Sequence, residues 1–398
     1  MVWLISLPLH FRIVLIAGSA ALLRVLYFTL DGLVSPGIEL SFADKDFANY
    51  WTAGKLVLSG QTADLFGPHD GYFAHLTAAF GADYPWHNWS YPPHYLFVVA
   101  PLGLFDYKLG MMLFLGVTGI LYLWSVRRFA GQGNYAIWIA ILPFLAHNFW
   151  TAQNGYLFAG CGLAALAFRD SRPVLAGVFL GLLTIKPQLG ILFPFLLVAE
   201  RRWLVIISAT VTTIALVALS AVVFGIGAWS GYLAEVVPYQ SHVMRELRGT
   251  FLWMLPSLYG TMRSWDFEAD IALSIHLAVA LPVMIATISG FFLTRNDEDR
   301  SILLLIATFI VTPYALSYDL GLLAPALGLL ATRLAAMDRT CGLVVMMATL
   351  LPSIMIPLGA LHATAVVPVL IFAVYAIAWR ETGAARRLKA IFRPKAGN

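Results

Sequence analysis

Charged residues are scarce in this chain of 398 amino acids. Asp, Glu, Lys and Arg make up 12% of the sequence, whereas 60% of it is hydrophobic. Soluble domains carry about 25% charged and roughly 45–50% apolar residues. A water-soluble fold of this length cannot bury so large an apolar excess, because the buried area grows slowly with chain length. Lipid is therefore the expected solvent for most of the surface.

The chain also lacks the signatures of common soluble enzyme modules. It contains no Gly-rich phosphate or dinucleotide loop, no His-Glu-x-x-His zinc motif and no Gly-x-Ser-x-Gly elbow. Its two cysteines, Cys161 and Cys341, stand in apolar stretches without metal-ligand spacing and are typical of small core residues. An enzyme of this composition is expected to work inside the membrane fold and its outer loops.

Long apolar runs alternate with short charged connections, which is the pattern of a polytopic membrane protein. We expect one membrane domain over residues 1–398, all-α, with about 10–13 transmembrane helices. The runs are 11–30, one that ends at Arg127, 135–147, 155–168, 173–185, 188–199, 203–226, 271–294, 301–314, 319–333, 342–360 and 363–380.

Basic residues mark alternate connections and predict the orientation. They are Arg127, Arg128, Arg169, Arg172, Arg201, Arg202, Arg295, Arg300, Arg333 and Arg339, followed by a basic tail over 381–398. The positive-inside rule makes their side cytoplasmic. Both termini are then cytoplasmic. The long connections 31–107 and 227–270 are non-cytoplasmic loops with interfacial helices, and the apolar stretch 95–105 lies in the interface.

Several paired runs are only about 13 residues long, which is short of the roughly 20 that a straight crossing needs. They meet at polar or Pro-containing breaks, at 147–154, 186–188 and 313–319. Irregular backbone at membrane depth survives only where it is buried in protein or lines a wet cavity. We expect the three breaks to converge on one cavity beneath the two long loops.

An acidic residue after the first span is the first candidate for catalysis. Asp46 stands one helical turn before Tyr50 in a segment rich in aromatic residues. A carboxylate there can take a proton from an alcohol if partial desolvation holds its pKa near the working pH. The alternative is a solvated loop acid or a helix N-cap. Further along the loop, His94 follows paired prolines that are typical of the start of an interfacial helix.

Lys186 interrupts an apolar run. A lysine between two spans costs several kcal/mol, on the order of 3, unless it is paired, so it predicts a functional site. Its ammonium would serve as a point charge for a phosphate. The alternative is a side chain that extends to the interface.

Other polar residues stand at the breaks and in the second long loop. They would bind sugar hydroxyls or phosphate, or else satisfy bent backbone, a solvated loop or a helix dipole. These candidates are His147, Gln153, Asn154, Gln188, Arg245, Arg248, Tyr318 and Asp319.

Several of these segments, taken in order, resemble glycosyltransferase family 87. The resemblance covers about 46–325 and is carried by Asp46-Phe47-Ala48-Asn49-Tyr50-Trp51, Gly60, Leu65-Phe66, Tyr91-Pro92-Pro93, Pro101-Leu102, Gln153-Asn154-Gly155, Lys186-Pro187-Gln188 and Tyr318-Asp319-Leu320. One departure is Tyr318, because some relatives have a histidine beside the last aspartate.

The resemblance implies a GT-C fold and a hexosyltransferase, a mannosyltransferase by analogy, of the bacterial plasma membrane. The donor would be a polyprenyl-phosphate sugar and the acceptor a lipid-linked or other glycan at the extracytoplasmic face. Asp46 maps to the family's essential aspartate and would be the general base of an inverting transfer. Lys186, with Arg245 and Arg248, would bind the donor phosphate.

Two alternatives remain open at this point. Asp44 is a rival for the role of base and, with Asp46, could hold a divalent ion, although two carboxylates alone argue weakly for a metal and no cofactor is expected. Asp44 is also expected to contact sugar or acceptor, together with Tyr50, His94 and the polar residues of the breaks. A transporter or flippase of polyprenyl-linked glycans is the alternative function, and it predicts a central path lined with ionisable residues.

Overall fold

A computed structural model describes residues 7–35, 37–38, 45–131, 133–335 and 338–391, and every regular element in these ranges is helical. The first half of the chain forms α2 (Leu9–Val34), α4 (Phe47–Leu58), α5 (Thr62–Leu65), α6 (His69–Phe80), η1 (Pro93–Tyr95), α7 (Leu96–Val99), η2 (Ala100–Leu104), α8 (Tyr107–Ala130), α9 (Tyr135–Thr151), α10 (Gly155–Phe168), α11 (Pro173–Leu183), η3 (Pro187–Gly190) and α12 (Phe193–Ala199).

The second half continues with α13 (Trp203–Phe224), α14 (Ile226–Gly231), the π-helical turn η4 (Tyr232–Val236), α15 (Val237–Glu246), α16 (Thr250–Trp253), α17 (Leu258–Ser264), α18 (Ala269–Leu293), α19 (Asp297–Val311), η5 (Ser317–Asp319), α20 (Ala324–Leu334), α21 (Arg339–Ala348), α22 (Leu351–Ala360), α23 (Val366–Glu381) and α24 (Ala384–Ile391). The expected all-α polytopic fold is confirmed.

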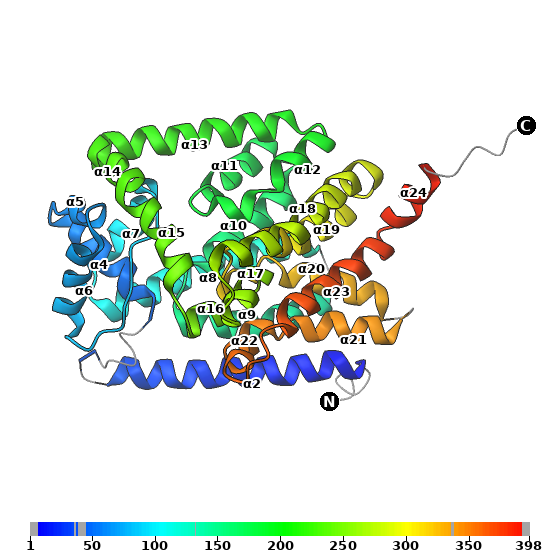
Figure 1. Ribbon diagram of the computed structural model, residues 1–398, viewed down its shortest axis with the longest axis horizontal. Helices are drawn as coiled ribbons and strands as arrows, with labels where there is room; N and C mark the ends of the chain where they lie inside the picture. Colours follow the sequence, from blue (N-terminus) through cyan, green and yellow to red (C-terminus); the bar gives the residue numbers. More distant parts are fainter. Residues whose placement is uncertain (1–6, 36, 39–44, 132, 336–337, 392–398) are drawn as a thin grey trace, which may run out of the picture.

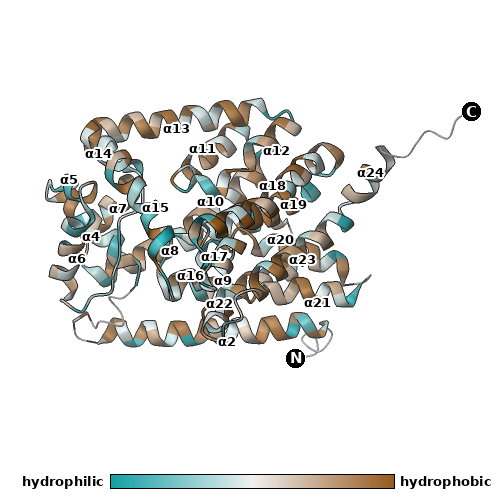
Figure 2. Cartoon of the chain, viewed as in Figure 1, coloured by the Kyte–Doolittle hydropathy of each residue, from teal (hydrophilic) through white to brown (hydrophobic). Residues whose placement is uncertain are grey.

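Four helices are by themselves long and apolar enough to cross a bilayer, namely α2, α8, α13 and α18. Helix α13 is the least enclosed of them, and Val222 at its far end is 81% exposed. Hydrophobic residues cover most of this helix in Figure 2. Large apolar side chains in such a position need lipid around them. The other apolar helices are shorter, so the expected 10–13 crossings depend on them, in pairs that meet at breaks.

The apolar run 342–360 is not one straight helix. Helices α21 and α22 meet at a bend of 75°. The Thr349 hydroxyl donates to the Met346 carbonyl at 2.6 Å, which closes the end of α21. Pro352 in the first turn of α22 has no N–H with which to continue the ladder. The bend lets α22 lie against α16, where Gly359 packs directly on the ring of Trp253.

The first long connection and the beginning of the second lie together at one end of the molecule. Figure 1 shows α4, α5, α6, α14 and α15 at the left, with α24 at the opposite end. Gly231 of α14 packs against the backbone of Phe66, which follows α5. The stretch expected in the interface forms η1, α7 and η2, which together cover Pro93–Leu104. Gly103 of η2 lies against the backbone of Gly54 in α4, so these loop helices form one layer.

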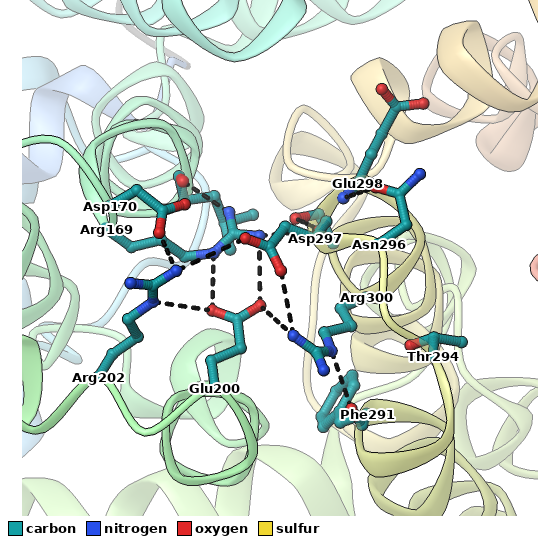
Figure 3. Close-up of polar contacts among 12 residues, drawn as sticks. Arg169, Asp170, Glu200, Arg202, Phe291, Thr294, Asn296, Asp297, Glu298 and Arg300 are labelled. Atoms are coloured by element: carbon teal, nitrogen blue, oxygen red, sulfur yellow. Dashed lines mark hydrogen bonds and ion pairs between the residues drawn. The ribbon is translucent and has the colours of Figure 1, made fainter.

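A charge cluster joins the helix ends away from the long loops (Figure 3). The Glu200 carboxylate, 1% exposed, bonds to the Arg169 guanidinium at 2.9 Å and lies 3.7 Å from Arg300. Burial raises the pKa of Glu200, whereas the charge of Arg169 opposes the shift. Arg202 pairs with Asp170 beside them. Three basic residues that were expected on one side of the membrane therefore share one network, which ties the ends of α10 and α12 to the start of α19.

The three predicted breaks meet in space. The Thr312 hydroxyl donates to the Gln188 carbonyl at 3.0 Å, which joins the second break to the third. Gly155, at the first break, packs on the carbonyl of Tyr318 in the third. A β-carbon at Gly155 would lie 1.9 Å from that carbonyl oxygen.

Gly155→Ala should therefore destabilise the protein. Overpacking costs about 1–3 kcal/mol even where side chains can yield, and here the obstacle is backbone. Thermal unfolding in detergent measures the loss. Gly116→Ala is the matched control, because Gly116 also lies in an apolar helix and its β-carbon would meet nothing within 4 Å. Equal unfolding midpoints for the two variants would contradict this account.

Candidate active site

A cavity of about 660 Å³ lies where the three breaks meet the two outer loops. One part of its wall is polar and includes Asp46, His87, Gln153, Lys186 and Asp319. Another part is apolar and is built mainly from the second loop and α18, with Val243, Met244, Leu247, Phe251, Met254 and Leu273. A cavity with these two kinds of wall suits a ligand that has both a polar head and a hydrocarbon part.

Asp46 is placed at the cavity by its position before α4. It is the N-cap residue of that helix, and its backbone N–H donates to the Thr151 carbonyl at 3.2 Å, at the end of α9. Its side chain makes no capping bond. The carboxylate Oδ1 instead bonds to His87 Nε2 at 2.9 Å, and 28% of the side chain is exposed. Asp46 therefore stands at the N-cap position, but its carboxylate does not cap the helix.

His87 was not among the residues singled out from the sequence. Its Nδ1 lies 2.7 Å from the Tyr84 hydroxyl, so Tyr84, His87 and Asp46 form a chain of hydrogen bonds. His87 is 41 residues from Asp46 along the chain, and no periodicity or spacing rule connects the two. The only local signal was that the segment 84–92, rich in Tyr, Trp and Pro, contains a histidine.

Tyr50 lies behind the cavity wall and ties the first loop to the first break. Its hydroxyl is 3.0 Å from that of Tyr91 and donates to Gln153 Oε1. The Asn154 amide donates to the Tyr91 hydroxyl at 2.8 Å. Burial raises the pKa of Tyr50 and of Tyr91 well above the usual range, so both remain hydroxyl donors. Among these four residues, Gln153 and Tyr91 line the cavity.

Lys186 and Asp319 form a buried ion pair. Lys186 Nζ bonds to Asp319 Oδ1 at 2.8 Å, and the side chains are 7% and 1% exposed. The second carboxylate oxygen of Asp319 accepts from the Leu316 N–H at 2.9 Å. The ammonium also lies 4.5 Å from the centre of the Tyr318 ring. Lys186 therefore does not extend to an interface, and sequence reasoning missed its partner because the two residues are 133 positions apart.

The remaining predicted residues of the breaks have different surroundings. Gln188 and Tyr318 line the cavity. His147 Nε2 bonds to the Ser317 hydroxyl at 2.8 Å, which ties α9 to η5. His94 is buried and stacks on Trp229 at 5.7 Å, and burial lowers the pKa of His94 to about 4. Neither His147 nor His94 lines the cavity, so these two predicted residues are not at the site.

The two arginines of the second loop differ in their surroundings. Arg245 lines the cavity, and its guanidinium pairs with Asp270 at 2.8 Å. The hydrogen bonds with Asp270 raise the pKa of Arg245. Arg248 donates to the carbonyls of Arg245 and Leu247 and does not line the cavity. Arg245 therefore stands at the cavity with its charge already paired.

Metal ligands are not gathered in the described part of the chain. No group of three His, Cys, Asp or Glu side chains that could hold an ion occurs there. Asp44 lies outside the described residues, so its place beside Asp46 stays a prediction.

A comparison with protein families adds a second line of argument. The model of glycosyltransferase family 87 matches residues 89–316, which is more than half of the chain. Gln153 and Lys186 lie inside the matched range, whereas Asp46, His87 and Asp319 lie outside it. None of the curated proteins and none of the solved structures matches the chain significantly.

Lys186→Met should destabilise the fold, because it leaves the Asp319 carboxylate buried without its partner. Breaking a buried ion pair from one side costs about 3–5 kcal/mol. The midpoint of thermal unfolding in detergent should fall accordingly. In Lys186→Met/Asp319→Asn the midpoint should recover, since the Asn oxygen still accepts from Leu316. A double variant as unstable as the single one would show that the pair itself is not the cause.

Proposed function

Because the chain belongs to glycosyltransferase family 87 and is a multi-pass membrane glycosyltransferase, we propose that it transfers a hexose from a polyprenyl-phosphate sugar to a lipid-linked or other glycan. Mannose is the proposed sugar. The observation that carries the proposal is that the Asp46 carboxylate and the Lys186 ammonium line one cavity, although 140 residues separate them. A transporter is no longer favoured, because the family is one of glycosyltransferases.

The two kinds of wall support a lipid-phosphate donor. A polyprenyl phosphate joins a hydrocarbon chain to a charged group, and its sugar is attached at the phosphate. The apolar wall formed by residues such as Met244, Phe251 and Leu273 suits the isoprene units next to the phosphate. Leu273 belongs to α18, which is long enough to span, so this wall continues into the membrane.

Lys186 is the proposed site for the donor phosphate. Asp319 compensates its charge at 2.8 Å, so the lysine is already paired within the protein. A phosphate at the cavity surface would share the lysine through charge-assisted hydrogen bonds without removing Asp319. Arg245 at the same cavity is a second cation, available if the phosphate competes with Asp270.

The proposed reaction is a single inverting displacement. The acceptor oxygen attacks the anomeric carbon while Asp46 takes the hydroxyl proton, and the bond between that carbon and the phosphate oxygen breaks. Polyprenyl phosphate leaves with the electron pair. Lys186 stabilises the charge that develops on it, so the leaving group needs no proton, and one carboxylate base completes the chemistry.

Asp46→Asn tests this proposal directly. Transfer of radiolabelled mannose from synthetic polyprenyl-phosphate mannose to a total lipid extract should fall at least about 100-fold, because the amide cannot take a proton. Donor binding and the unfolding midpoint should not change. Asp64→Asn is the control, since Asp64 lies in the same loop and does not line the cavity. Full transfer by Asp46→Asn would show that Asp46 is not the general base. If the wild type transferred no sugar from any polyprenyl-phosphate hexose, the proposed donor would be wrong.

The proposed orientation places the cavity on the extracytoplasmic side of a bacterial plasma membrane, with both termini in the cytoplasm. Asp83 and Ser171 are both exposed. The thiol of Asp83→Cys should react with a membrane-impermeant maleimide in whole cells, whereas the thiol of Ser171→Cys should react only after permeabilisation. A Cys341→Ser background removes the half-buried thiol, and Cys161 is buried. The reverse labelling pattern would invert the topology.

A further inference from the structure

We propose that His87 and Tyr84 are positioning residues for Asp46, which hold its carboxylate so that one oxygen is left to take the acceptor proton. The inference rests on the proposed role of Asp46 as the general base. Asp46 and His87 both line the cavity, and Tyr84 is buried behind His87 at 4% exposure. The three side chains therefore form a chain that runs from a buried hydroxyl to the cavity surface.

The chemistry of the groups sets the direction of each hydrogen bond. An ionised carboxylate only accepts hydrogen bonds, so His87 Nε2 carries the hydrogen that bonds Asp46 Oδ1 at 2.9 Å. In the neutral imidazole Nδ1 is then an acceptor, and the Tyr84 hydroxyl donates to it at 2.7 Å. Asp46 thus sets the tautomer of His87, and the Tyr84 hydroxyl holds the ring in place from its other side.

Only one oxygen of the Asp46 carboxylate is held in this way. Among the described residues no donor bonds to Oδ2. Since Asp46 makes no capping bond either, the His87 contact is what fixes the rotation of the carboxylate. The free oxygen is left for the acceptor hydroxyl.

The segment that carries His87 is itself braced. Pro85 restricts the backbone between Tyr84 and Trp86, and the Tyr84 ring stacks on Phe80 at 5.2 Å. Asn49 of α4 donates to the Asn88 carbonyl at 2.9 Å, one residue after His87. These contacts hold His87 against the start of α4, where Asp46 is located. Precise placement of a base needs such support, because its own rotamer has to be locked.

The first long loop contains a second contact between a histidine and an aspartate. His75 Nε2 bonds to Asp64 Oδ2 at 2.8 Å, which is the same chemistry at nearly the same distance. Neither His75 nor Asp64 lines the cavity. This pair shows what a histidine–aspartate contact does when it has only a structural role, and it supplies the matched control.

Steady-state transfer separates the positioning role from a structural one. His87→Leu should lower kcat about 10- to 100-fold, as the loss of a supporting partner does in metal sites, with the donor KM and the unfolding midpoint unchanged. His87→Gln keeps an N–H near the position of Nε2, so its kcat should fall less than about 10-fold. Tyr84→Phe should lower kcat roughly 5-fold, as expected for one neutral hydrogen bond. His75→Leu should leave kcat at the wild-type value.

An unchanged kcat in His87→Leu, or a loss that lies only in the donor KM, would overturn the inference. A second measurement needs no turnover and so separates this failure from failure of the proposed function. In protein labelled with ¹⁵N-histidine, the His87 signal, assigned by its loss in His87→Gln, should show the hydrogen on Nε2. In Tyr84→Phe the hydrogen should stay on Nε2, because Asp46 still accepts it, and the Nδ1 signal should shift because that nitrogen loses its donor. Wild-type His87 with its hydrogen on Nδ1 would refute the inference even if the sugar donor is a different one.

Discussion

The ion pair between Lys186 and Asp319 is the constraint on which the outer half of this structure depends. Each residue stands at a break in an apolar run. Burying either charge without its partner would destabilise the fold by about 3–5 kcal/mol. The two breaks must therefore remain together, although they are 133 residues apart. Asp319 also accepts from the Leu316 N–H, so the same carboxylate satisfies irregular backbone where no helix provides a partner.

The cavity follows from this junction. Gly155 packs on the carbonyl of Tyr318, next to the ion pair, so the first break joins the other two. The backbone N–H of Asp46 donates to Thr151 at that break, and Tyr50 bonds to Gln153. The first outer loop is thereby anchored on the breaks, and its carboxylate reaches the same cavity as the lysine. The proposed base and the proposed phosphate site come together because backbone that cannot face lipid must be satisfied inside the protein.

Local patterns predicted the helices well where a polar residue stands at each end of an apolar run. The run 155–168 became α10, Gly155–Phe168, with Asn154 and Arg169 at its two ends. They did not predict the bend of 75° between α21 and α22 within the run 342–360. In the sequence only Thr349 and Pro352 mark that bend, and neither by itself ends an apolar run. Its cause includes a contact with α16 from another part of the chain, Gly359 against Trp253, which periodicity cannot show.

The sequence by itself determined that the protein is an all-helical membrane protein, and it predicted the polar breaks and named Asp46 and Lys186 as candidates for one site. Composition and the length of apolar runs decide such properties locally. Only the tertiary structure decided the partners: His87 for Asp46, Asp319 for Lys186 and Asp270 for Arg245. Hydrogen bonds and ion pairs act over about 3 Å, so residues far apart in the chain meet only where the whole fold brings their side chains together.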